Sequence, residues 1–446
     1  MLQDYINTFT DIEQIDTLIE MEHREHNVEI ERMQWEQQLP LMNVGQREAY
    51  DRIVSAIEQP DQPRIFFVNG PGGTGKSLLF KVLLSFVRPQ AKIAIPVASS
   101  GIAAILLPEG RTAHSRFKIP IKTSNKMCCN VRLNTALAKL LQETDLILWD
   151  EAVMSSKYNF EAVDRCLKDM MGAVDPTLKT KLFGGKVVVF GGDFRQIIPV
   201  VVKGSRADVI AECVSSSDIW SQVQVPQLTE NMSVRYAGQE AAALAQKLLA
   251  IGDGSNGFKS AVPIEREWLL ASDDLPSLID KVYPSFATET NPISFDGRAI
   301  LASKNDQVDA INDKAAAIFP GESQVYESCD SISDSDDPQS DSANYPMEFL
   351  HSIKLTGMPN HTLEIKEGMP LIITRNLDVN NGLCNGTKVY VTRLQRYSTA
   401  VRLYNRQDGE EYFLPRILFF TDEGEYPFVL KRRQFPGKTC ICNDHS

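Results

Sequence analysis

The amino-acid sequence predicts an α/β protein built on parallel sheets, and three observations support this class. Apolar runs at 64–68, 92–98, 145–149 and 186–190 have the composition of buried strands. Helical spacing follows the first of these runs, at 77–84. Polar residues stand directly after the runs, at the strand ends where ligands collect in open α/β sheets.

The stretch between the first strand and the first helix, residues 70–77, reads G-P-G-G-T-G-K-S and matches the phosphate loop of nucleotide hydrolases. Its glycines leave little side-chain bulk, so successive backbone N–H groups can close on a phosphate. A chance glycine-rich turn is the alternative, and the strand and helix on either side argue against it. The predicted nucleotide contacts here are Gly70, Gly72, Gly73, Thr74, Gly75, Lys76 and Ser77.

The chemistry of phosphoryl transfer assigns roles to charged residues near this loop. Lys76 is expected to reach the outer phosphates, and the Ser77 hydroxyl to ligate magnesium. Two acids end the strand at 145–149, and the reaction needs one for the magnesium shell and one to orient or deprotonate water. Asp150 suits the metal role and Glu151 the water role. Paired acids after a strand are often only the start of a loop, but a phosphate loop upstream favours catalysis.

Two glutamines extend the predicted nucleotide site. Gln196, after the strand at 186–190, is placed to sense the terminal phosphate, with Arg195 tying it to its surroundings. Gln46, upstream of the phosphate loop, can read the amino and ring-nitrogen face of adenine. By itself Gln46 would be an ordinary helix residue. The predicted catalytic residues are therefore Lys76, Asp150, Glu151 and Gln196.

Hydroxyl, basic and aromatic residues lie close together at 110–117, a mixture typical of a single-strand contact. A base could stack on Phe117. The segment 118–140 is a basic island that contains Lys118, Lys122, Lys126, Arg132 and Lys139. For the serines at 99–100, an ordinary helix cap explains the pattern as well as a phosphate contact. The candidate DNA contacts are Ser99, Ser100, Gly101, Thr112, His114, Ser115 and Phe117.

Composition excludes several classes of protein. The chain has 446 residues, a formal net charge of −12 and 43% hydrophobic residues, so it does not coat nucleic acid with its whole surface. A local basic track remains compatible with this charge. No apolar run approaches a membrane span, and the first residues lack a signal-peptide core. The eight cysteines show no disulfide framework, which fits a reduced intracellular compartment, and zinc at Cys128–Cys129 or at Cys440 and Cys442 is weakly supported.

The chain divides into three predicted parts. Residues 1–40 read as an acidic extension of one or two solvated helices, and its pair His23 and His26 reads as surface rather than metal site. Residues 41–225 form the first α/β unit, and residues 226–446 form a second. Within the second unit, a serine- and aspartate-rich stretch at 326–342 is predicted to be a mobile loop. Short strands separated by turns at about 350–430 predict a small β-barrel.

An ordered set of segments resembles Pif-one-type DNA helicases of superfamily one, notably the transposon-borne Helitron branch. The resemblance runs from about residue 41 to residue 435. The segments that carry it are Gln46, 70–77, 99–104, 112–117, 192–196, 228–232 and 381–387.

This resemblance implies a P-loop NTPase with two RecA-like lobes, ATP and magnesium between them, and single-stranded DNA or duplex junctions as partners. It implies 5′→3′ translocation, unwinding, and roles in telomere maintenance, DNA repair and recombination, or in transposon mobility. The nucleus, or the mitochondrion, is the implied location, and no membrane is implied.

The sequence departs from the family pattern in two places. Ser233 stands where the family has an arginine directed at the phosphates, and Arg235 is the nearest candidate for that contact. The tail, residues 437–446, does not resemble the family's continuation, so we expect the second lobe to be incomplete. Two alternatives follow: a non-catalytic fragment that binds ATP and DNA, and a P-loop ATPase that is not a helicase.

Overall fold

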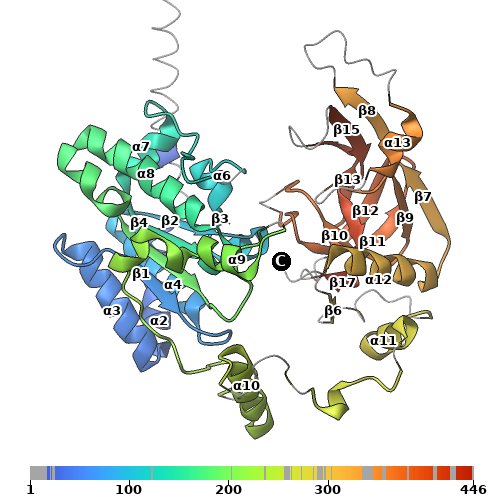
Figure 1. The fold of residues 1–446 in the computed structure, drawn as a ribbon, viewed down its shortest axis with the longest axis horizontal. Coiled ribbons are helices and arrows are strands. Elements are labelled where there is room, and N and C mark those ends of the chain that lie inside the picture. The colour runs from blue at the N-terminus through green and yellow to red at the C-terminus, as the bar shows by residue number, and fades with distance from the viewer. Residues whose placement is uncertain are drawn as a thin grey trace, which may run out of the picture. The chain divides into compact units, whose positions relative to one another are not determined.

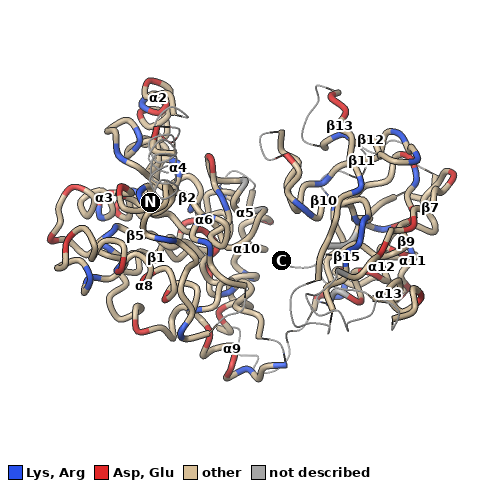
Figure 2. The backbone as a smooth tube through the Cα atoms, turned by 90° about the horizontal axis from the view of Figure 1, so that it is seen from above, with Lys and Arg blue, Asp and Glu red and all other residues tan. Residues whose placement is uncertain are grey.

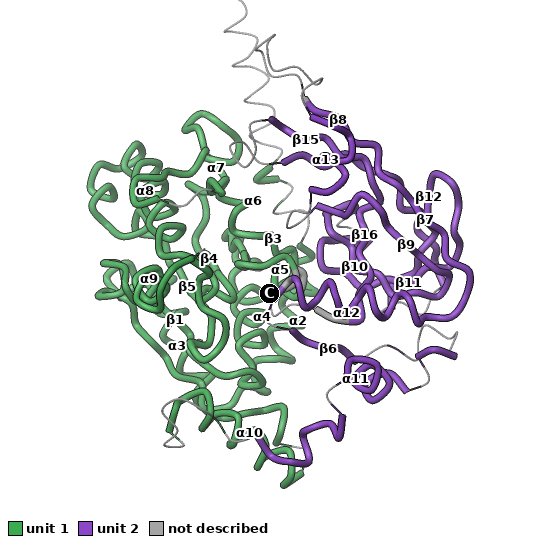
Figure 3. The backbone as a smooth tube through the Cα atoms, turned by 45° about the vertical axis from the view of Figure 1, so that its right-hand side comes forward, with its two compact units in different colours: residues 1–262 green, residues 263–446 purple. Residues whose placement is uncertain are grey.

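The computed structural model divides the chain into two compact units, Met1–Val262 and Pro263–Ser446 (Figures 1 and 3). It describes most of residues 18–443, and its longest internal gaps are 256–261, 289–294, 334–344, 354–357, 405–408 and 422–427. Each unit is described by itself below. None of the described helices combines the length and apolar character that crossing a lipid bilayer requires.

The first unit is built on a five-stranded parallel sheet, as the sequence predicts, in the order β1-β5-β4-β2-β3. The four long strands are almost continuously apolar and buried, because helices cover both faces of the sheet. Beyond the four predicted strands, the short β3 extends the edge. The strands are β1 (Ile65–Asn69), β2 (Ile93–Ala98), β3 (Arg111–Thr112), β4 (Thr144–Asp150) and β5 (Val187–Gly192).

Alternating strand residues feed two hydrophobic clusters, one on each face of this sheet. Phe67 and Trp149 pack with residues of α7 and α8, whereas Phe66 and Leu148 pack with residues of α3 and α4 (Figure 1). The helices of this unit are α2 (Val28–Gln38), α3 (Val44–Glu58), α4 (Lys76–Val87), α5 (Gly101–Leu106), α6 (Ala113–Phe117), α7 (Ala136–Glu143), α8 (Lys157–Val174), α9 (Arg206–Glu212) and α10 (Gln239–Gly252).

Most residues of α2, in the N-terminal extension, are exposed, but the helix also contacts the rest of the first unit. Glu31 of α2 is buried, accepting a hydrogen bond of 2.6 Å from Ser85 and pairing with Arg88 at 3.2 Å. The indole of Trp35 donates to the hydroxyl of Tyr50 at 2.9 Å. Glu31 and Trp35 of α2 therefore contact Ser85 of α4, Arg88 directly after α4 and Tyr50 of α3, and local charge does not predict these contacts.

The second unit has an α/β part in which sequence-distant strands meet. Strand β6 (Ile300–Leu301) pairs in parallel with β17 (Cys442–Asn443), so the tail that lacks the family pattern adds a strand here. Helices α11 (Leu275–Val282) and α12 (Asn305–Ile318) pack on an aromatic cluster that includes Phe286.

The strands predicted to form a barrel form an antiparallel sheet in the order β13-β12-β11-β10-β16. No pairing recorded among the described residues joins β13 to β16, so no closed barrel is seen. Two smaller antiparallel sheets accompany it, β14-β15-β8 and β7-β9. The strands are β7 (Ser323–Glu327), β8 (Cys329–Ser333), β9 (Thr362–Lys366), β10 (Pro370–Ile373), β11 (Lys388–Leu394), β12 (Ser398–Leu403), β13 (Tyr412–Pro415), β14 (Ile417–Phe420), β15 (Val429–Gln434) and β16 (Gly437–Thr439).

The predicted mobile loop at 326–342 begins as regular structure. Residues 326–327 belong to β7 and residues 329–333 to β8, and β8 pairs with β15. The remainder of the predicted loop, from 334, lies outside the described residues. Serine and aspartate composition predicted a loop, but alternate residues of β8 are buried against a partner strand.

Candidate functional site

The phosphate loop joins β1 to α4 and adopts the backbone that its glycines permit. Gly73 and Gly75 have φ of +81°, a region that L side chains rarely adopt. Thr74 is fully buried, and its hydroxyl donates to the Pro71 carbonyl at 2.8 Å. Gly72 has open space beside it, so the loop leaves one side free for a ligand. Ser77 is exposed in the first turn of α4.

Gln46 lies directly behind this loop and is fully buried. Its Nε2 donates to the Thr74 carbonyl at 2.8 Å, and its Oε1 accepts from the Asn43 N–H at 2.9 Å within a capping box. A Cβ at Gly75 would overlap Gln46 Nε2. Both ends of the amide therefore support the phosphate loop and the start of α3. The amide nitrogen still has a second N–H and the oxygen a second lone pair, so contact with adenine, the predicted role, would use these remaining positions.

Lys76 and the two predicted acids are brought together at the carboxyl end of the sheet. Lys76 is buried, and its ammonium donates to the Gly70 carbonyl at 2.5 Å. Asp150 ends β4 and is 7% exposed. Burial raises the pKa of Asp150, and burial followed by the charge of Asp150 raises the pKa of Glu151, while Lys76 opposes both effects.

Glu151 shows two signs of a functional position. Its backbone is left-handed, with φ of +48°, a conformation that costs free energy for a residue other than glycine. Its Oε2 is buried and has no hydrogen-bond partner among the residues that the structure describes. Buried polar atoms nearly always find partners, so an orphaned carboxylate oxygen points to a ligand or a reacting water.

The donor set at this site fits magnesium. The Ser77 hydroxyl and the Asp150 carboxylate are hard oxygen ligands, which Mg²⁺ prefers, and few protein ligands suffice because the ion keeps several waters and substrate phosphates. Burial raises the pKa of the Asp150 carboxyl, and a cation bound beside it would favour the charged form.

The turn after β5 places Gln196 at the surface, with its N–H bonded to the Asp193 carbonyl at 2.9 Å. Arg195 ties this turn to its neighbours: the guanidinium reaches Asp193 at 3.1 Å and Asp253, at the end of α10, at 2.6 Å. Among the described residues, no hydrogen bond to the Gln196 side chain is recorded.

A segment at 231–234 lies against the phosphate loop, and the sequence did not assign Asn231 a role of its own. Asn231 Nδ2 donates to the Gly72 carbonyl at 3.3 Å, and Asn231 Oδ1 accepts from the N–H groups of Ser233 and Val234. The Gly73 carbonyl accepts from the Met232 N–H at 2.8 Å. The sequence signal was the family-like stretch 228–232, which located the segment but did not reveal these contacts.

Ser233 stands beside the phosphate loop, where a Cβ at Gly73 would come within 2.9 Å of its hydroxyl oxygen. Arg235, the predicted substitute for the missing arginine, is exposed and pairs with Glu230 at 3.4 Å. In the described residues Arg235 therefore pairs with Glu230, and Ser233 is the residue that stands beside the phosphate loop.

Three of the predicted DNA-contacting hydroxyls serve local structure. Ser99 accepts from the Trp149 indole at 3.0 Å, Ser100 caps α5, and Thr112 caps α6. Gly101 is half-buried at the start of α5. The alternative of an ordinary helix cap thus holds for Ser100, and the structure shows the same capping role for Thr112, which the sequence did not predict.

Phe117 requires a correction. Its ring is 1% exposed and stacks on Trp149 in the core, with centroids 5.9 Å apart. Because other side chains already cover almost the whole ring, a base cannot stack on it. The predicted stacking role of Phe117 is therefore wrong. The polar residues at 112–116 that precede Phe117 could not show on which side of this short helix the phenyl ring lies.

His114 and Ser115 line a groove of about 590 Å³ with residues of the basic segment, including the exposed Lys118 and Arg132. Burial lowers the pKa of His114, which favours its neutral form. Lys122 lies outside the described residues. Figure 2 shows basic and acidic positions interspersed over both units, so this groove is a local feature of an acidic chain.

The parallel sheet, the phosphate loop, the buried Asp150 and the half-buried Glu151 give this unit the fold and site arrangement of P-loop NTPases. The family model described as PIF1-like helicase matches residues 41–261, and that for the 2B domain of DNA helicase Pif1 matches residues 348–394. The chain belongs to the PIF1-like helicase family, which confirms the resemblance seen in the sequence.

Curated relatives are longer than this chain. The ATP-dependent DNA helicase PIF1 of Xenopus laevis is 25% identical over 382 residues, covering 84% of this chain and 51% of the relative. The ATP-dependent DNA helicase Pif1 of Psychrobacter sp. is 25% identical over 325 residues, covering 72% of this chain and 43% of the relative. The chain thus spans about half the length of the curated relatives it matches.

Solved structures support the fold. The Pif1 helicase from Candida albicans superposes with a TM-score of 0.59 at 19% identity, covering 90% of this chain and 85% of that one. Bacteroides Pif1 bound to single-stranded DNA gives 0.57 at 19% identity, covering 88% and 82%.

Proposed function

We propose that this chain is an ATP-dependent DNA helicase that couples ATP hydrolysis to 5′→3′ movement on single-stranded DNA and to unwinding at duplex junctions. The observation that carries the proposal is the acid pair beside Lys76, in which Asp150 is buried and Glu151 is half-buried. Glu151 has a left-handed backbone, and its Oε2 has no hydrogen-bond partner among the described residues. Family membership supports the same reaction.

In this proposal the chain's own groups divide the work of hydrolysis. Backbone N–H groups of the phosphate loop and the Lys76 ammonium bind the phosphates. Glu151, whose raised pKa makes it a stronger base than an ordinary carboxylate, orients and deprotonates the attacking water. Ser77 and Asp150 would hold magnesium, which neutralises charge on the phosphates when bound. The Gln196 side chain would sense the terminal phosphate of ATP by contacting it.

DNA binding is proposed for the groove lined by His114, Ser115, Lys118 and Arg132. Roles in telomere maintenance, DNA repair and recombination, or in transposon mobility, follow from the family resemblance alone, as does a nuclear or mitochondrial location.

A specific observation favours a second candidate function, ATP and DNA binding without efficient turnover. Ser233 occupies the position beside the phosphate loop where the family pattern has an arginine, and Arg235 pairs with Glu230 instead. An arginine that reaches the phosphates is worth roughly 10³–10⁵ in rate where it has been measured in GTPases. On this candidate the chain binds ATP but hydrolyses it slowly.

One experiment separates the two candidates. ATP binding and steady-state hydrolysis are measured with and without single-stranded DNA, for the parent chain and for Lys76→Ala and Glu151→Gln. The helicase proposal expects hydrolysis stimulated by DNA, loss of ATP binding in Lys76→Ala, and retained binding without hydrolysis in Glu151→Gln. ATP binding with no DNA-stimulated hydrolysis in the parent supports the second candidate. Parent-like hydrolysis by Glu151→Gln would show that another group activates the water.

A further inference from the structure

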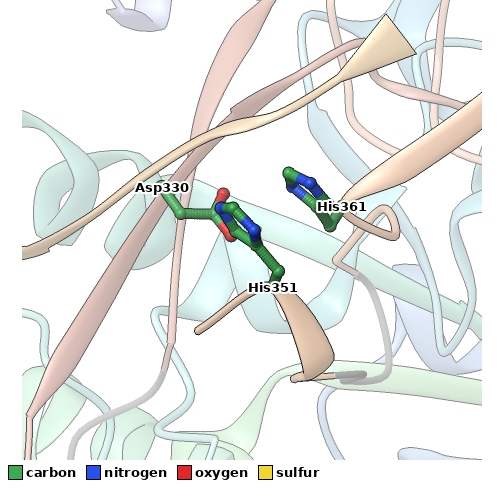
Figure 4. Close-up of side chains that lie close together, drawn as sticks. All are labelled: Asp330, His351 and His361. Atoms are coloured by element: carbon green, nitrogen blue, oxygen red, sulfur yellow. The ribbon is translucent and has the colours of Figure 1, made fainter. Parts of the chain in front are cut away.

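The second unit contains a cluster that has the residue types of a metal site but not its geometry. Asp330 lies on β8, His351 on α13 (Met347–Ser352), and His361 directly before β9 (Figure 4). The two imidazole rings stack with centroids 3.5 Å apart and planes 7° from parallel, so their in-plane lone pairs cannot point at one ion. Asp330 already accepts hydrogen bonds from Arg432 and Ser328. This cluster is therefore a structural contact between α13, β8 and the start of β9.

A feature of the first unit leads further, because it links the proposed nucleotide site to α10. The turn at 193–196 follows β5 and carries Gln196, the predicted sensor of the terminal phosphate. One side of this turn is fixed in the core, since the ring of Phe194 stacks on Phe67 with centroids 4.9 Å apart. The backbone is closed by the hydrogen bond from the Gln196 N–H to the Asp193 carbonyl. Gln196 itself is exposed at the open side of the turn.

Arg195, in the same turn, is held from two sides. Asp193 accepts from the backbone N–H of Arg195 and from its guanidinium, each at 3.1 Å, and is 4% exposed. The guanidinium also donates to Asp253, directly after the last residue of α10, at 2.6 Å. A buried carboxylate requires a partner, so Asp193 fixes the guanidinium in the place from which it reaches Asp253.

The aliphatic part of Arg195 packs on the last turn of α10. A Cβ at Gly252 would lie 3.1 Å from Arg195 Cδ and 3.2 Å from its Cβ and Cγ, so a glycine is needed for this close approach. A cation at a helix C-terminus is also favoured by the helix dipole. None of the residues of α10 is buried, so burial does little to hold this helix, and Arg195 fixes its end.

The position of α10 in the chain gives this contact a possible consequence for movement. It is the last described helix of the first unit, and the chain then continues to the second unit, which begins at Pro263. A change in how the end of α10 is held therefore acts on the segment that connects the two units.

We propose that Arg195 is a positioning residue that couples the state of the nucleotide to the end of α10. Contact of Gln196 with the terminal phosphate orders the turn at 193–196, and Arg195 passes this order to Asp253. The inference rests on the proposed function, because it requires ATP at the phosphate loop. The alternative is an ordinary surface ion pair, which contributes little and is insensitive to the nucleotide. The two differ in whether the end of α10 responds to the terminal phosphate.

Hydrogen–deuterium exchange of the 446-residue chain measures this response without requiring hydrolysis. The amides to follow are those of Asp253, Gly254 and Ser255, which donate to carbonyls in the last turns of α10. With magnesium and saturating nucleotide, a non-hydrolysable ATP analogue is expected to slow their exchange at least about two-fold relative to ADP, since an ordered segment opens less often. Fluorescent-analogue binding, measured for every variant, verifies saturation.

Four variants separate coupling from a merely structural contact. Arg195→Ala and Asp253→Ala each remove one end of the link and should abolish the difference between the ATP analogue and ADP. Gln196→Ala should abolish the same difference while the nucleotide-free chain exchanges at the parent's rate, because the ion pairs are intact. Arg206→Ala, at an exposed arginine that begins α9, is the matched control and should respond as the parent does.

The outcomes distinguish this inference from the proposed function. If the parent binds neither nucleotide, the proposed function fails and the coupling fails with it. If the parent binds both but exchanges equally with each, the coupling alone is wrong. A folded Arg195→Ala or Gln196→Ala variant that keeps the difference would also overturn it, as would its loss in Arg206→Ala. Circular dichroism verifies folding, and the partly exposed Asp253 provides the deciding variant if Arg195→Ala does not fold.

Discussion

The rings of Phe117 and Trp149 stack in the core of the first unit, with centroids 5.9 Å apart and planes 21° from parallel. Trp149 belongs to β4, directly before the acid pair, and its indole also donates to Ser99. Phe117 ends α6. This contact therefore anchors the helix that carries His114 and Ser115 to the strand that carries Asp150.

Phe117→Ala is expected to lower the free energy of unfolding by about 3–5 kcal/mol, because it removes a large buried ring and leaves a cavity. Phe117→Leu should cost far less, since it retains much of the volume. Urea denaturation measures both. Because the ring faces the core, the folded Phe117→Leu variant should keep the parent's affinity for single-stranded DNA. A loss of DNA affinity in this stable variant would return Phe117 to the DNA interface.

The sequence located the parallel sheet and the catalytic segments for a physical reason. Strands buried on both faces are continuous apolar runs, and a phosphate loop needs glycines at fixed spacing, so both leave local signals. Gly73 and Gly75 were identified in this way, and their positive φ is the property that the spacing encodes.

What the sequence could not predict depends on contacts between distant segments. Gln46 was chosen for adenine, but its amide reaches Thr74 across 28 positions. Asn231 was noted only as part of a motif, and it bonds to Gly72 across 159 positions. Periodicity and composition describe neighbours in sequence, so they cannot show which distant backbone groups a polar side chain satisfies.

Lys118→Ala and Arg132→Ala are expected to weaken single-stranded DNA binding uniformly across base sequences. If each cation meets a phosphate, each variant should reduce the slope of log affinity against log salt by about 1. Lys179→Ala, at an exposed lysine in a different part of the first unit, is the control. Fluorescence anisotropy at several salt concentrations measures the slopes. An unchanged slope in both groove variants would exclude this groove as the DNA track.

Asp150→Asn is expected to stabilise the fold at neutral pH in magnesium-free buffer. Burial raises the pKa of Asp150, so the folded state holds its proton more tightly than the unfolded state does. The stability that this proton provides is complete below the unfolded pKa of about 3.9 and is lost as pH rises through the raised value. The advantage of Asp150→Asn should therefore disappear as pH falls toward about 4.

Asp175→Asn is a control for which the expected effect on stability, and its change with pH, are opposite to those of Asp150→Asn. Hydrogen bonds from Thr177 lower the pKa of the exposed Asp175 carboxyl. Its stabilisation is present above the unfolded pKa and is lost as pH falls, so the substitution should reduce stability at neutral pH and have less effect in acid. Thermal melts at several pH values compare the two variants. Equal pH dependence in both would contradict the assignment for Asp150.

Asn231→Ala is expected to weaken ATP binding by about 1 kcal/mol, roughly five-fold, because the phosphate loop loses a hydrogen bond that fixes the Gly72 carbonyl. Asn231→Asp keeps an oxygen to accept from Ser233 and Val234 but lacks the donor to Gly72. If the donor matters, Asp should bind ATP as weakly as Ala. If Asp restores parent affinity, the Ser233 and Val234 contacts carry the effect. A fluorescent ATP analogue measures both.

The buried ion pair of Asp330 and Arg432 allows a double-mutant cycle. Arg432→Met leaves the Asp330 carboxylate buried without a countercharge, and the expected cost is about 3–5 kcal/mol. Asp330→Leu alone should also destabilise, because it strands the guanidinium. With both substitutions no buried charge remains, so the double variant should be more stable than the sum of the single effects predicts, by about 1–3 kcal/mol.

The double variant should nevertheless remain less stable than the parent. Arg432 also donates to the carbonyls of Leu350, Ile353 and Pro359, and methionine leaves these acceptors buried without donors. Arg432→Lys tests this part separately, since an ammonium keeps the charge but has only three donors for groups that the guanidinium reaches with five. Strictly additive single effects in urea denaturation would show that the two charges are already compensated by other groups.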